Sequence, residues 1–293
     1  MRRILIAGAA GLLGQHLVNK FKDKYSVLAV DIADCPFDNH AHIKYIQGDL
    51  MKFAALEKEI SSFAPELVFN CAGLTDVDAC ETNRKLAYNL NVKLVENLLR
   101  LDFNKIIHFS SDYVFNGENG PYSEADNPDP IDYYGETKLL SEEILEAAGR
   151  RYVIIRSNVL FGFGKNIRPN YITWLIENLK IGRKLDIARD QFNNPIHAGN
   201  LADATIEIAE SDYSGIIHIA GADYLSRYEI ALLTAGHFRL DRTLINPVVT
   251  SELGQAAERP LKGGLKIDKA RKLLQTPLLP FVKALNLLDK RNV

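Results

Sequence analysis

The sequence has few cysteines, and they are not clustered. The three cysteines, Cys35, Cys71 and Cys80, are odd in number and form no CxxC pair. We therefore expect neither a disulfide framework nor a zinc site, and reduced thiols favour a cytoplasmic protein. The seven histidines show no spacing typical of a metal site either, so no metal is predicted.

Long apolar runs and an excess of one charge are also missing. No run approaches the roughly 20 apolar residues that a membrane helix needs, so no membrane association is predicted. The 35 Lys and Arg residues face 37 Asp and Glu residues, and this net charge of -2 argues against nucleic-acid binding. The 293 residues are 47% hydrophobic and 25% charged, an ordinary globular composition that rules out a disordered or collagen-like chain.

Short β-branched runs alternate with longer helical patterns through the first half. Because strand–helix–strand alternation requires right-handed crossovers, we expect an α/β fold with a doubly wound parallel sheet. In the predicted helix Arg84–Leu101, leucines recur every four residues from Leu86 to Leu98 as an apolar stripe. The predicted strands are Arg3–Ala7, Tyr25–Asp31, Ile43–Gln47, Leu67–Ala72, Lys105–Ser110 and Tyr152–Arg156, and the other helices are Gly11–Lys22, Phe53–Phe63 and Tyr134–Ala148.

The regular alternation ends after Arg156. We expect one further strand, Ile216–Ala220, and the helices Asn170–Lys180, Asn200–Glu210, Arg227–Phe238 and Leu278–Leu288. Residues 1–157, with a returning part near 196–220, are predicted to form the main domain. Residues 158–195 and 221–293 are predicted to form a small C-terminal lobe.

A glycine-rich turn joins the first strand to the first helix. Gly8, Gly11 and Gly14 form a GxxGxxG pattern there, with Leu12 and Leu13 between the last two. Glycine lets the backbone turn sharply and approach a ligand closely. A helix N-terminus offers N–H groups and partial positive charge to a pyrophosphate. We therefore expect these five residues to bind a dinucleotide, with a purely structural turn as the alternative.

Acidic residues follow the second and third predicted strands. Asp31 suits a carboxylate that accepts hydrogen bonds from the adenosine ribose hydroxyls. It would repel a 2′-phosphate, so NAD(H) is favoured and NADP(H) is the alternative. Asp49, followed by Leu50, has two interpretations: a bond to the adenine amino group, or a cap for the next helix.

A tyrosine and a lysine lie four residues apart at the start of the helix Tyr134–Ala148. Residues at this spacing share one helical face, so the Tyr134 phenol and the Lys138 ammonium point the same way. A nearby ammonium favours phenolate and lowers the pKa of the phenol. Ser110 and Ser111 end the preceding strand, where ligands of open α/β sheets bind. The order and separation of these features fit one dinucleotide site that carries a Ser-Tyr-Lys reduction centre.

With these motifs the sequence resembles the extended short-chain dehydrogenase/reductase family, and within it the dTDP-4-dehydrorhamnose reductase branch. The resemblance spans nearly the whole chain. It rests on Gly8–Gly14, Asn70–Asp78 with Glu81, Ser110–Gly117, Tyr134–Lys138, Arg156–Gly162, Asp190–Pro195 and Glu258–Pro260.

The resemblance implies a Rossmann-type NAD(P) domain and a small lobe that binds a nucleotide sugar. Ser111 then steadies the sugar carbonyl, Tyr134 donates the proton and Lys138 lowers the pKa of Tyr134. Gln15 and His16 stand where some bacterial members carry an acid linked to metal-dependent dimerisation, so a metal is not implied, and a homodimer is expected only by analogy. Further implied contacts are Ala72 and Gly73 with the cofactor, and Thr75, Tyr113, Asn158 and Arg259 with the substrate.

Three functions follow as hypotheses. The first is NAD(P)H-dependent reduction of a 4-keto-6-deoxy nucleotide sugar. The second keeps the fold but is an epimerase or dehydratase, and the dehydratase chemistry lacks a partner because Tyr113 follows Asp112 where an acid is needed. The third is a non-catalytic regulatory subunit resembling that of methionine adenosyltransferase, against which the intact Tyr134 and Lys138 pair argues.

Overall fold

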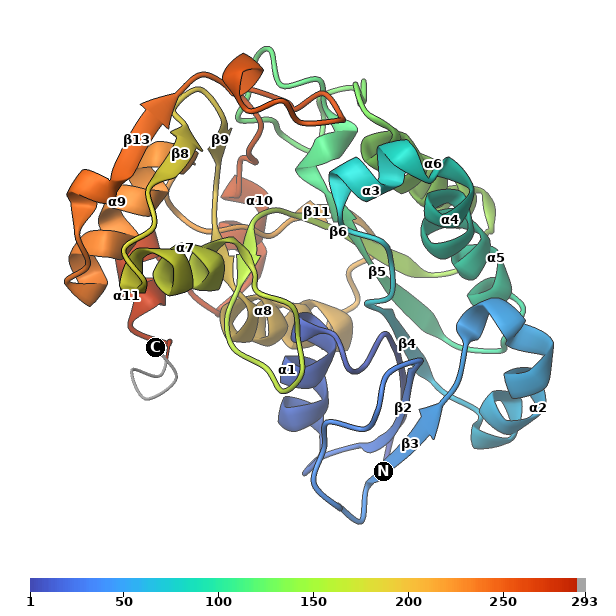
Figure 1. Cartoon of the computed structure of the whole chain (residues 1–293). Coiled ribbons are helices and arrows are strands. Elements are labelled where there is room, and N and C mark those ends of the chain that lie inside the picture. The colour runs from blue at the N-terminus through green and yellow to red at the C-terminus, as the bar shows by residue number, and fades with distance from the viewer. Residues whose placement is uncertain (289–293) are drawn as a thin grey trace.

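Seven parallel strands form one sheet at the centre of the molecule (Figure 1). The structure is a computed structural model that describes residues 1–288. From β1 the chain adds β2 and β3 on one side of the sheet and then β4, β5, β6 and β11 on the other. Ligands of such sheets bind at the carboxyl ends of the strands near this switch point between β1 and β4. The predicted doubly wound sheet is confirmed. Its order is β11 (Gly215–His218), β6 (Tyr152–Ser157), β5 (Lys105–Ser111), β4 (Leu67–Asn70), β1 (Arg3–Ala7), β2 (Ser26–Asp31) and β3 (Ile43–Gln47).

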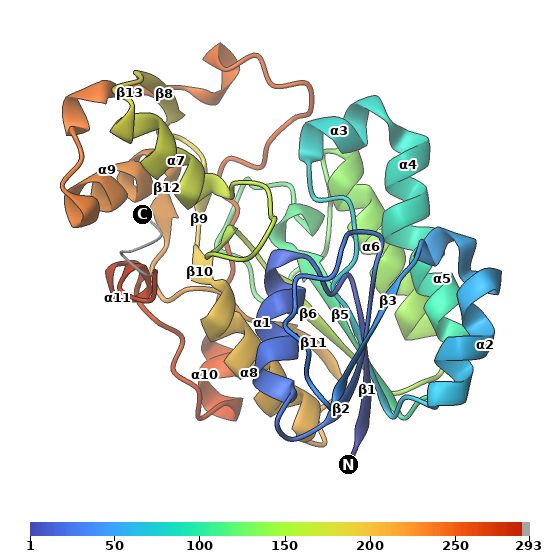
Figure 2. The same cartoon turned by 60° about the horizontal axis from the view of Figure 1, so that its bottom comes forward.

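Helices cover both faces of the sheet (Figure 2). Alternate residues of β1 enter opposite cores: Ile4 and Ile6 pack on one side, Leu5 and Ala7 on the other. This explains why the strands are apolar nearly throughout. The first core is closed by α1 (Leu12–Phe21), α8 (Ala198–Glu210) and α10 (Asp268–Leu273), and the second by α2 (Phe53–Phe63), α5 (Leu94–Leu99) and α6 (Tyr133–Ala147).

The helix predicted over Arg84–Leu101 is present as far as Leu99, but it contains a π turn that the leucine pattern does not predict. After the short α3 (Val77–Thr82), the chain forms α4 (Arg84–Tyr88), then a π-helical segment at Asn89–Lys93, and then α5. The wider π turn shifts which residues face inward. Leu86 is therefore 42% exposed, whereas Leu98 is fully buried and Asn91 also lies inside.

A smaller lobe packs around a third apolar core. Here α7 (Tyr171–Lys180), α9 (Arg227–Phe238) and α11 (Phe281–Leu285) surround the parallel pair β8 (Leu185–Ala188) and β13 (Ile245–Val248). Pro280 is the N-cap of α11, so the helix predicted over Leu278–Leu288 is shorter than expected. The division at residue 157 stays a prediction. Two further strand pairs are β7 (Leu160–Phe161) with β10 (Ile196–His197), and β9 (Phe192–Asn193) with β12 (Leu225–Ser226).

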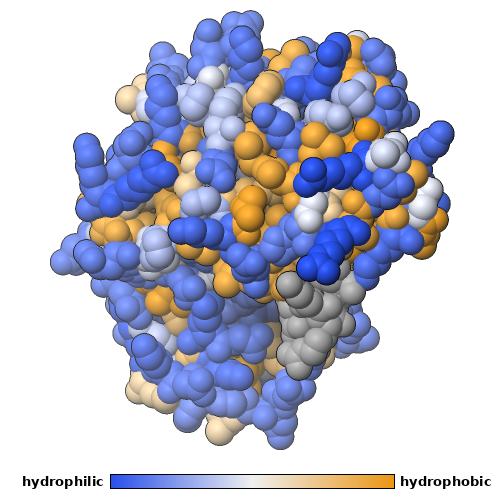
Figure 3. Space-filling view, turned by 90° about the vertical axis from the view of Figure 1, so that its left-hand side faces the viewer, coloured by the Kyte–Doolittle hydropathy of each residue, from blue (hydrophilic) through white to orange (hydrophobic). Residues whose placement is uncertain are grey.

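The surface of the lobe is mixed. Figure 3 shows the side of the molecule that carries it, where hydrophobic side chains lie scattered among hydrophilic ones. Between residues 1 and 288, the structure contains no helix with the length and hydropathy needed to cross a bilayer.

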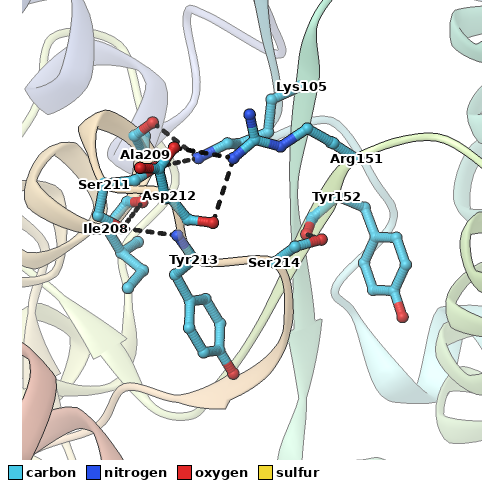
Figure 4. Close-up of polar contacts among 9 residues, drawn as sticks. All are labelled: Lys105, Arg151, Tyr152, Ile208, Ala209, Ser211, Asp212, Tyr213 and Ser214. Carbon is cyan, nitrogen blue, oxygen red and sulfur yellow. Dashed lines mark hydrogen bonds and ion pairs between the residues drawn. The ribbon is translucent and has the colours of Figure 1, made fainter.

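One buried and one exposed set of polar contacts fix the amino end of the sheet, opposite the ligand-binding edge (Figure 4). The Lys105 ammonium, at the start of β5, donates to the backbone oxygen of Ala209 at 3.2 Å and to that of Ser211. These carbonyls end α8, where a cation is favoured. Arg151 donates to the Asp212 carboxylate at 3.3 Å. The loop that leads into β11 is thereby tied to β5 and β6.

Candidate active site

The three glycines of the turn after β1 meet different constraints. Gly8 has a φ of 75°, and a Cβ there would lie 2.5 Å from the backbone nitrogen of Ala72. A Cβ on Gly14 would lie 2.3 Å from the oxygen of Gly8. At Gly11 the added atom would meet only the Gly8 oxygen, at 3.3 Å. The fold therefore requires the first and third glycines, whereas the second mainly keeps the turn open to a ligand.

The start of α1 fits a dinucleotide pyrophosphate. Gly11 is its N-cap, no side chain caps the helix, and its first turn holds no acidic residue. The backbone N–H groups of this turn are thus available to an anion. Leu13 is buried in the core and Leu12 is half-buried beside it. The residues present therefore suit the predicted cofactor.

Asp31 and Asp49 both accept backbone hydrogen bonds. Asp31, the last residue of β2, accepts from the N–H of Ala10 at 2.9 Å and from that of Ala33 at 3.0 Å, which holds its carboxylate beside the glycine turn. Asp49 accepts from the N–H of Met51 at 2.9 Å and caps the helical turn that begins at the buried Leu50. The capping interpretation of Asp49 is confirmed, and its bond to adenine stays a prediction.

The segment after β4 runs beside the glycine turn. Ala72 lies against Gly8, and Gly73 approaches the Asn91 side chain so closely that a Cβ would lie 2.9 Å from Oδ1. Asn91 lies in the π-helical segment, accepts from the N–H of Leu74 at 2.7 Å and donates to its oxygen at 3.1 Å. The predicted cofactor-lining residues are thus held in place by the π turn, while Thr75 is exposed nearby.

Ser111 and Tyr134 meet at the carboxyl end of β5. Tyr134 lies close enough to Ser111 for the serine hydroxyl to affect its pKa, and the Tyr134 ring packs edge-on against Tyr113 with 5.5 Å between centroids. Burial raises the pKa of Tyr134, and the Ser111 hydroxyl acts in the opposite direction. Ser111 also accepts from the N–H of Tyr113 at 3.2 Å. The structure thus brings together two of the three predicted catalytic residues; lowering of the Tyr134 pKa by Lys138 stays a prediction.

Asp132 positions the helix that carries Tyr134. Its Oδ1 accepts from the N–H of Gly135 at 2.9 Å and caps α6, while Oδ2 has no hydrogen-bond partner within residues 1–288. Burial raises the pKa of Asp132 to about 6. A helix N-terminus favours such a carboxylate.

Lys138 lies one helical turn beyond Tyr134 and is buried. Burial lowers the pKa of Lys138 to about 8, opposed by the nearby Glu142 carboxylate. Its Nζ lies 3.5 Å from Nε2 of His108, on β5. Sequence reasoning missed His108, although a histidine inside the apolar run of a central strand was a usable signal.

Asp112 lies next to Ser111 and joins several segments of the chain. Its Oδ2 accepts from the Asn158 amide at 3.0 Å, the Asn193 amide at 3.2 Å and the N–H of Gly264 at 3.0 Å. Burial raises the pKa of Asp112. Asn158, predicted to contact substrate, uses its nitrogen here; its Oδ1 has no partner within the described part of the chain.

Arg259 and Tyr113 lie on the side of the smaller lobe. The Arg259 guanidinium pairs with Asp78 of α3 at 2.9 Å and donates to the oxygen of Ala257 at 2.9 Å. Burial raises the pKa of Tyr113 to about 12, opposed by the guanidinium groups of Arg227 and Arg259. Arg227 was not predicted and has no sequence signal of its own. The two arginines thus lie close to Tyr113, and one of them, Arg259, is paired with a carboxylate.

Comparisons with known proteins agree with this arrangement. Residues 1–292 match the model of the family described as RmlD substrate binding domain. The beta subunit of methionine adenosyltransferase 2 from Danio rerio is 29% identical over 97% of this chain and 89% of its own.

Two further similar proteins are named as reductases. The probable low-salt glycan biosynthesis reductase Agl14 of Haloferax volcanii is 30% identical over 90% of this chain and 89% of its own. The crystal structure of a hypothetical dTDP-4-dehydrorhamnose reductase from Sulfolobus tokodaii is 33% identical, covers 95% of this chain and 97% of its own, and has a TM-score of 0.80. The chain belongs to the RmlD substrate-binding domain family, a family of the extended short-chain dehydrogenase/reductase type.

Proposed function

We propose that this chain is an NAD(P)H-dependent reductase that converts the 4-keto group of a 4-keto-6-deoxy nucleotide sugar into a hydroxyl group. One observation carries the proposal: Ser111 and Tyr134 lie close together, both buried, at the carboxyl end of β5, with the buried Lys138 one turn further along α6. The related reductases of Haloferax volcanii and Sulfolobus tokodaii support it.

Tyr134, Ser111 and Lys138 each have a separate role in the reduction. A nicotinamide cofactor, when bound at the glycine turn, supplies the hydride. Tyr134 donates its phenolic proton to the carbonyl oxygen as that oxygen gains negative charge, and Ser111 orients the same oxygen with its hydroxyl. The Lys138 ammonium favours the phenolate that Tyr134 becomes. General acid catalysis of this kind contributes about 10²–10⁴-fold to the rate.

The preferred cofactor is NADH. Asp31 holds its carboxylate at the glycine turn by two backbone hydrogen bonds. An adenosine 2′-phosphate placed beside it is repelled, whereas ribose hydroxyls donate to it. The three cysteines are free thiols, which favours a cytoplasmic location.

A second candidate function is regulation without catalysis. The similarity to a methionine adenosyltransferase subunit favours it. The complete set of Ser111, Tyr134 and Lys138 argues for catalysis, since a subunit that only binds a partner does not need these three groups buried at one edge of the sheet.

The test is a panel of nucleotide 4-ketosugars incubated with NADH and with NADPH, with oxidation followed by absorbance. Wild-type protein should oxidise NADH faster than NADPH with one of these sugars. Tyr134→Phe should lower kcat by about 10²–10⁴-fold and leave the Kd for NADH unchanged. Tyr133→Phe is the matched control, because Tyr133 is the neighbouring residue but stacks on Arg84.

Three outcomes contradict the proposal. Undiminished turnover in Tyr134→Phe removes the assigned proton donor. Turnover of a nucleotide sugar without added NADH or NADPH indicates an epimerase that retains its cofactor. Co-purification of a partner enzyme, with no NADH oxidation on any ketosugar, indicates a regulatory subunit.

A further inference from the structure

A buried chain of polar side chains lies beneath the proposed reaction centre, and of its members the mechanism above uses only Lys138. Its members are Asn70 at the end of β4, His108 on β5, and Ser141 and Lys138 on α6. All four are at most 5% exposed. Burying so many polar atoms is unfavourable unless each is satisfied, so the arrangement needs an explanation.

The hydrogen bonds fix the direction of the chain. The N–H of Ala72 donates to Oδ1 of Asn70 at 3.3 Å, so the Asn70 amide nitrogen faces Nδ1 of His108, 3.1 Å away. Because an amide nitrogen only donates, Nδ1 accepts and the proton of the neutral imidazole lies on Nε2. Nε2 then donates to Oγ of Ser141 at 3.0 Å, and the Ser141 hydroxyl donates to the Lys138 backbone oxygen at 2.6 Å.

This tautomer has a consequence for Lys138. Its Nζ lies 3.5 Å from Nε2 of His108, a nitrogen that carries a proton and cannot accept from an ammonium. Burial and the Lys138 charge lower the pKa of His108 well below its usual value, so the imidazole stays neutral. On the side of the sheet, the ammonium therefore meets a donor rather than an acceptor.

The other groups that face Lys138 do not supply the missing acceptor. The carboxylate of Glu142, on the same helix, is engaged by Arg156 through contacts of 3.0 Å and 2.6 Å. The Cys80 thiol of α3 is neutral near physiological pH, because burial raises its pKa to about 11. The ammonium is thus left to find its acceptors on the side of the cofactor and substrate.

We propose that His108 is a positioning residue: its Nε2–H turns the Lys138 ammonium away from the sheet and toward the bound cofactor and Tyr134. The same chain ends on the N–H of Ala72, in the segment beside Gly8. His108 therefore joins the wall of the cofactor site to the lysine. This inference rests on the proposed function.

Two substitutions separate the two ring nitrogens. The His108→Asn amide occupies the place of Nδ1 and keeps the contact with Asn70, but it leaves nothing at Nε2. The His108→Gln amide reaches the place of Nε2, facing Ser141 and Lys138, and gives up Asn70. Ser141→Ala is the matched control, since it removes the acceptor of the Nε2 proton and a bond to the Lys138 backbone but leaves the imidazole beside the ammonium.

The measurements are thermal unfolding, the Kd for NADH by fluorescence titration, and kcat against pH. Activity needs the Lys138 ammonium, so kcat should fall as pH rises through its pKa. In His108→Asn, water enters beside the ammonium and raises that pKa. The alkaline limb should then move to higher pH, kcat should fall by about 10–100-fold, and NADH should bind more weakly. His108→Gln and Ser141→Ala should keep the wild-type limb.

A double-mutant cycle gives a second readout. In a Lys138→Met background, His108→Asn should change kcat by less than about 3-fold, because the two residues act through one contact. The NADH titration needs no ketosugar, so it tests His108 even if the reductase activity fails. If His108→Asn does not fold, the test rests on His108→Gln: an alkaline limb at the wild-type pH supports the proposal, and a displaced limb contradicts it.

Several results would overturn the proposal. One is a His108→Asn variant whose kcat, alkaline limb of the kcat–pH profile and NADH affinity all equal those of the wild type. Another is an equal loss in both His108 variants with the alkaline limb unmoved, which indicates a packing role only. A third is an alkaline limb of the kcat–pH profile that moves in Ser141→Ala as far as it does in His108→Asn. A fourth is a limb that moves in His108→Gln. Either shift assigns the effect to another contact.

Discussion

The two halves of the sheet edge that form the site are built differently. At β1 and β2 the backbone makes the site: Gly8 and Gly14 allow close approach, and the start of α1 carries no capping side chain. At β4, β5 and α6, buried side chains make it, and the contacts of His108 join residues 30 to 38 positions apart. The first half depends on local glycine spacing, the second on partners supplied by several elements.

This difference predicts how each half fails. A backbone site is damaged by added atoms, because its geometry leaves no room for them. A side-chain site is damaged by removed atoms, because a buried polar group that loses its partner retains its desolvation cost. Substitutions of matched size in the two halves can therefore test the comparison.

The largest effect is expected from Glu142→Ala in the side-chain half. Glu142 and Arg156 form an ion pair in which both side chains are 2% exposed, with Nη2 and Oε2 2.6 Å apart. Removing the carboxylate leaves a buried guanidinium without its counter-ion, which should lower the free energy of unfolding by about 3–5 kcal/mol. Urea unfolding followed by circular dichroism measures this loss.

Two controls sharpen that measurement. Arg100→Ala breaks the pair with Glu57, whose side chains are 54% and 33% exposed, and should change the free energy of unfolding by less than about 1 kcal/mol. Glu142→Leu combined with Arg156→Met removes both charges and should restore most of the loss. A double variant as unstable as Glu142→Ala would show that packing, not the unpaired charge, dominates.

An intermediate effect is expected in the backbone half, where the glycines can be compared directly. Gly14→Ala places a methyl group 2.3 Å from the Gly8 oxygen and should lower the free energy of unfolding by about 1–3 kcal/mol. Gly11→Ala meets the same oxygen only at 3.3 Å and should cost less than about 1 kcal/mol.

Cofactor binding should separate the two variants further. The new methyl group of Gly11→Ala lies where the pyrophosphate approaches, so its Kd for NADH should rise about 10-fold or more, although the fold is intact. Thermal unfolding and fluorescence titration of the same samples measure both properties. Normal NADH affinity in Gly11→Ala would remove the assignment of this glycine to the ligand.

The backbone half could be predicted from the sequence because its signals are local. The strand, the glycine turn and Asp31 follow one another within about 30 residues, and the structure places them at one edge. The helix over Arg84–Leu101 was predicted as well, but the π turn inside it could not be. Its leucine pattern is regular, but the π turn is stabilised by Asn91, whose partners Leu74 and Thr137 lie far away in the sequence.

The side-chain half was only partly predictable for the same reason. Ser111 and Tyr134 were identified and do meet, because strand ends and helix starts converge at the edge of a parallel sheet. The roles of His108, Asp112 and Arg227 depend on donors from several chain segments. The predicted contact of Asn158 with the substrate stays a prediction, and its amide nitrogen binds Asp112, a contact across 46 positions that no spacing rule reveals.

The smallest effect tests a contact in which the half-exposed Asp78 carboxylate joins α3 to the segment that carries Arg259. Asp78 accepts from the N–H of Ala257 at 2.9 Å and pairs with Arg259, which is 8% exposed. Asp78→Asn keeps an oxygen for Ala257 but removes the charge that holds the guanidinium. If Arg259 contacts the substrate, KM for the ketosugar should rise about 3–10-fold, because positioning of a binding group is lost while Ser111 and Tyr134 are untouched.

Steady-state kinetics at fixed NADH measure KM and kcat separately for this variant, and kcat should stay within about 2-fold of wild type. Asp203→Asn is the control, since it removes the charge of an exposed pair with Lys20 that joins α8 to α1, away from the smaller lobe. If kcat falls as steeply as KM rises, Asp78 also supports the start of α6, which carries Tyr134. The helix α3 would then belong to the side-chain half of the site and not only to the contact with the lobe.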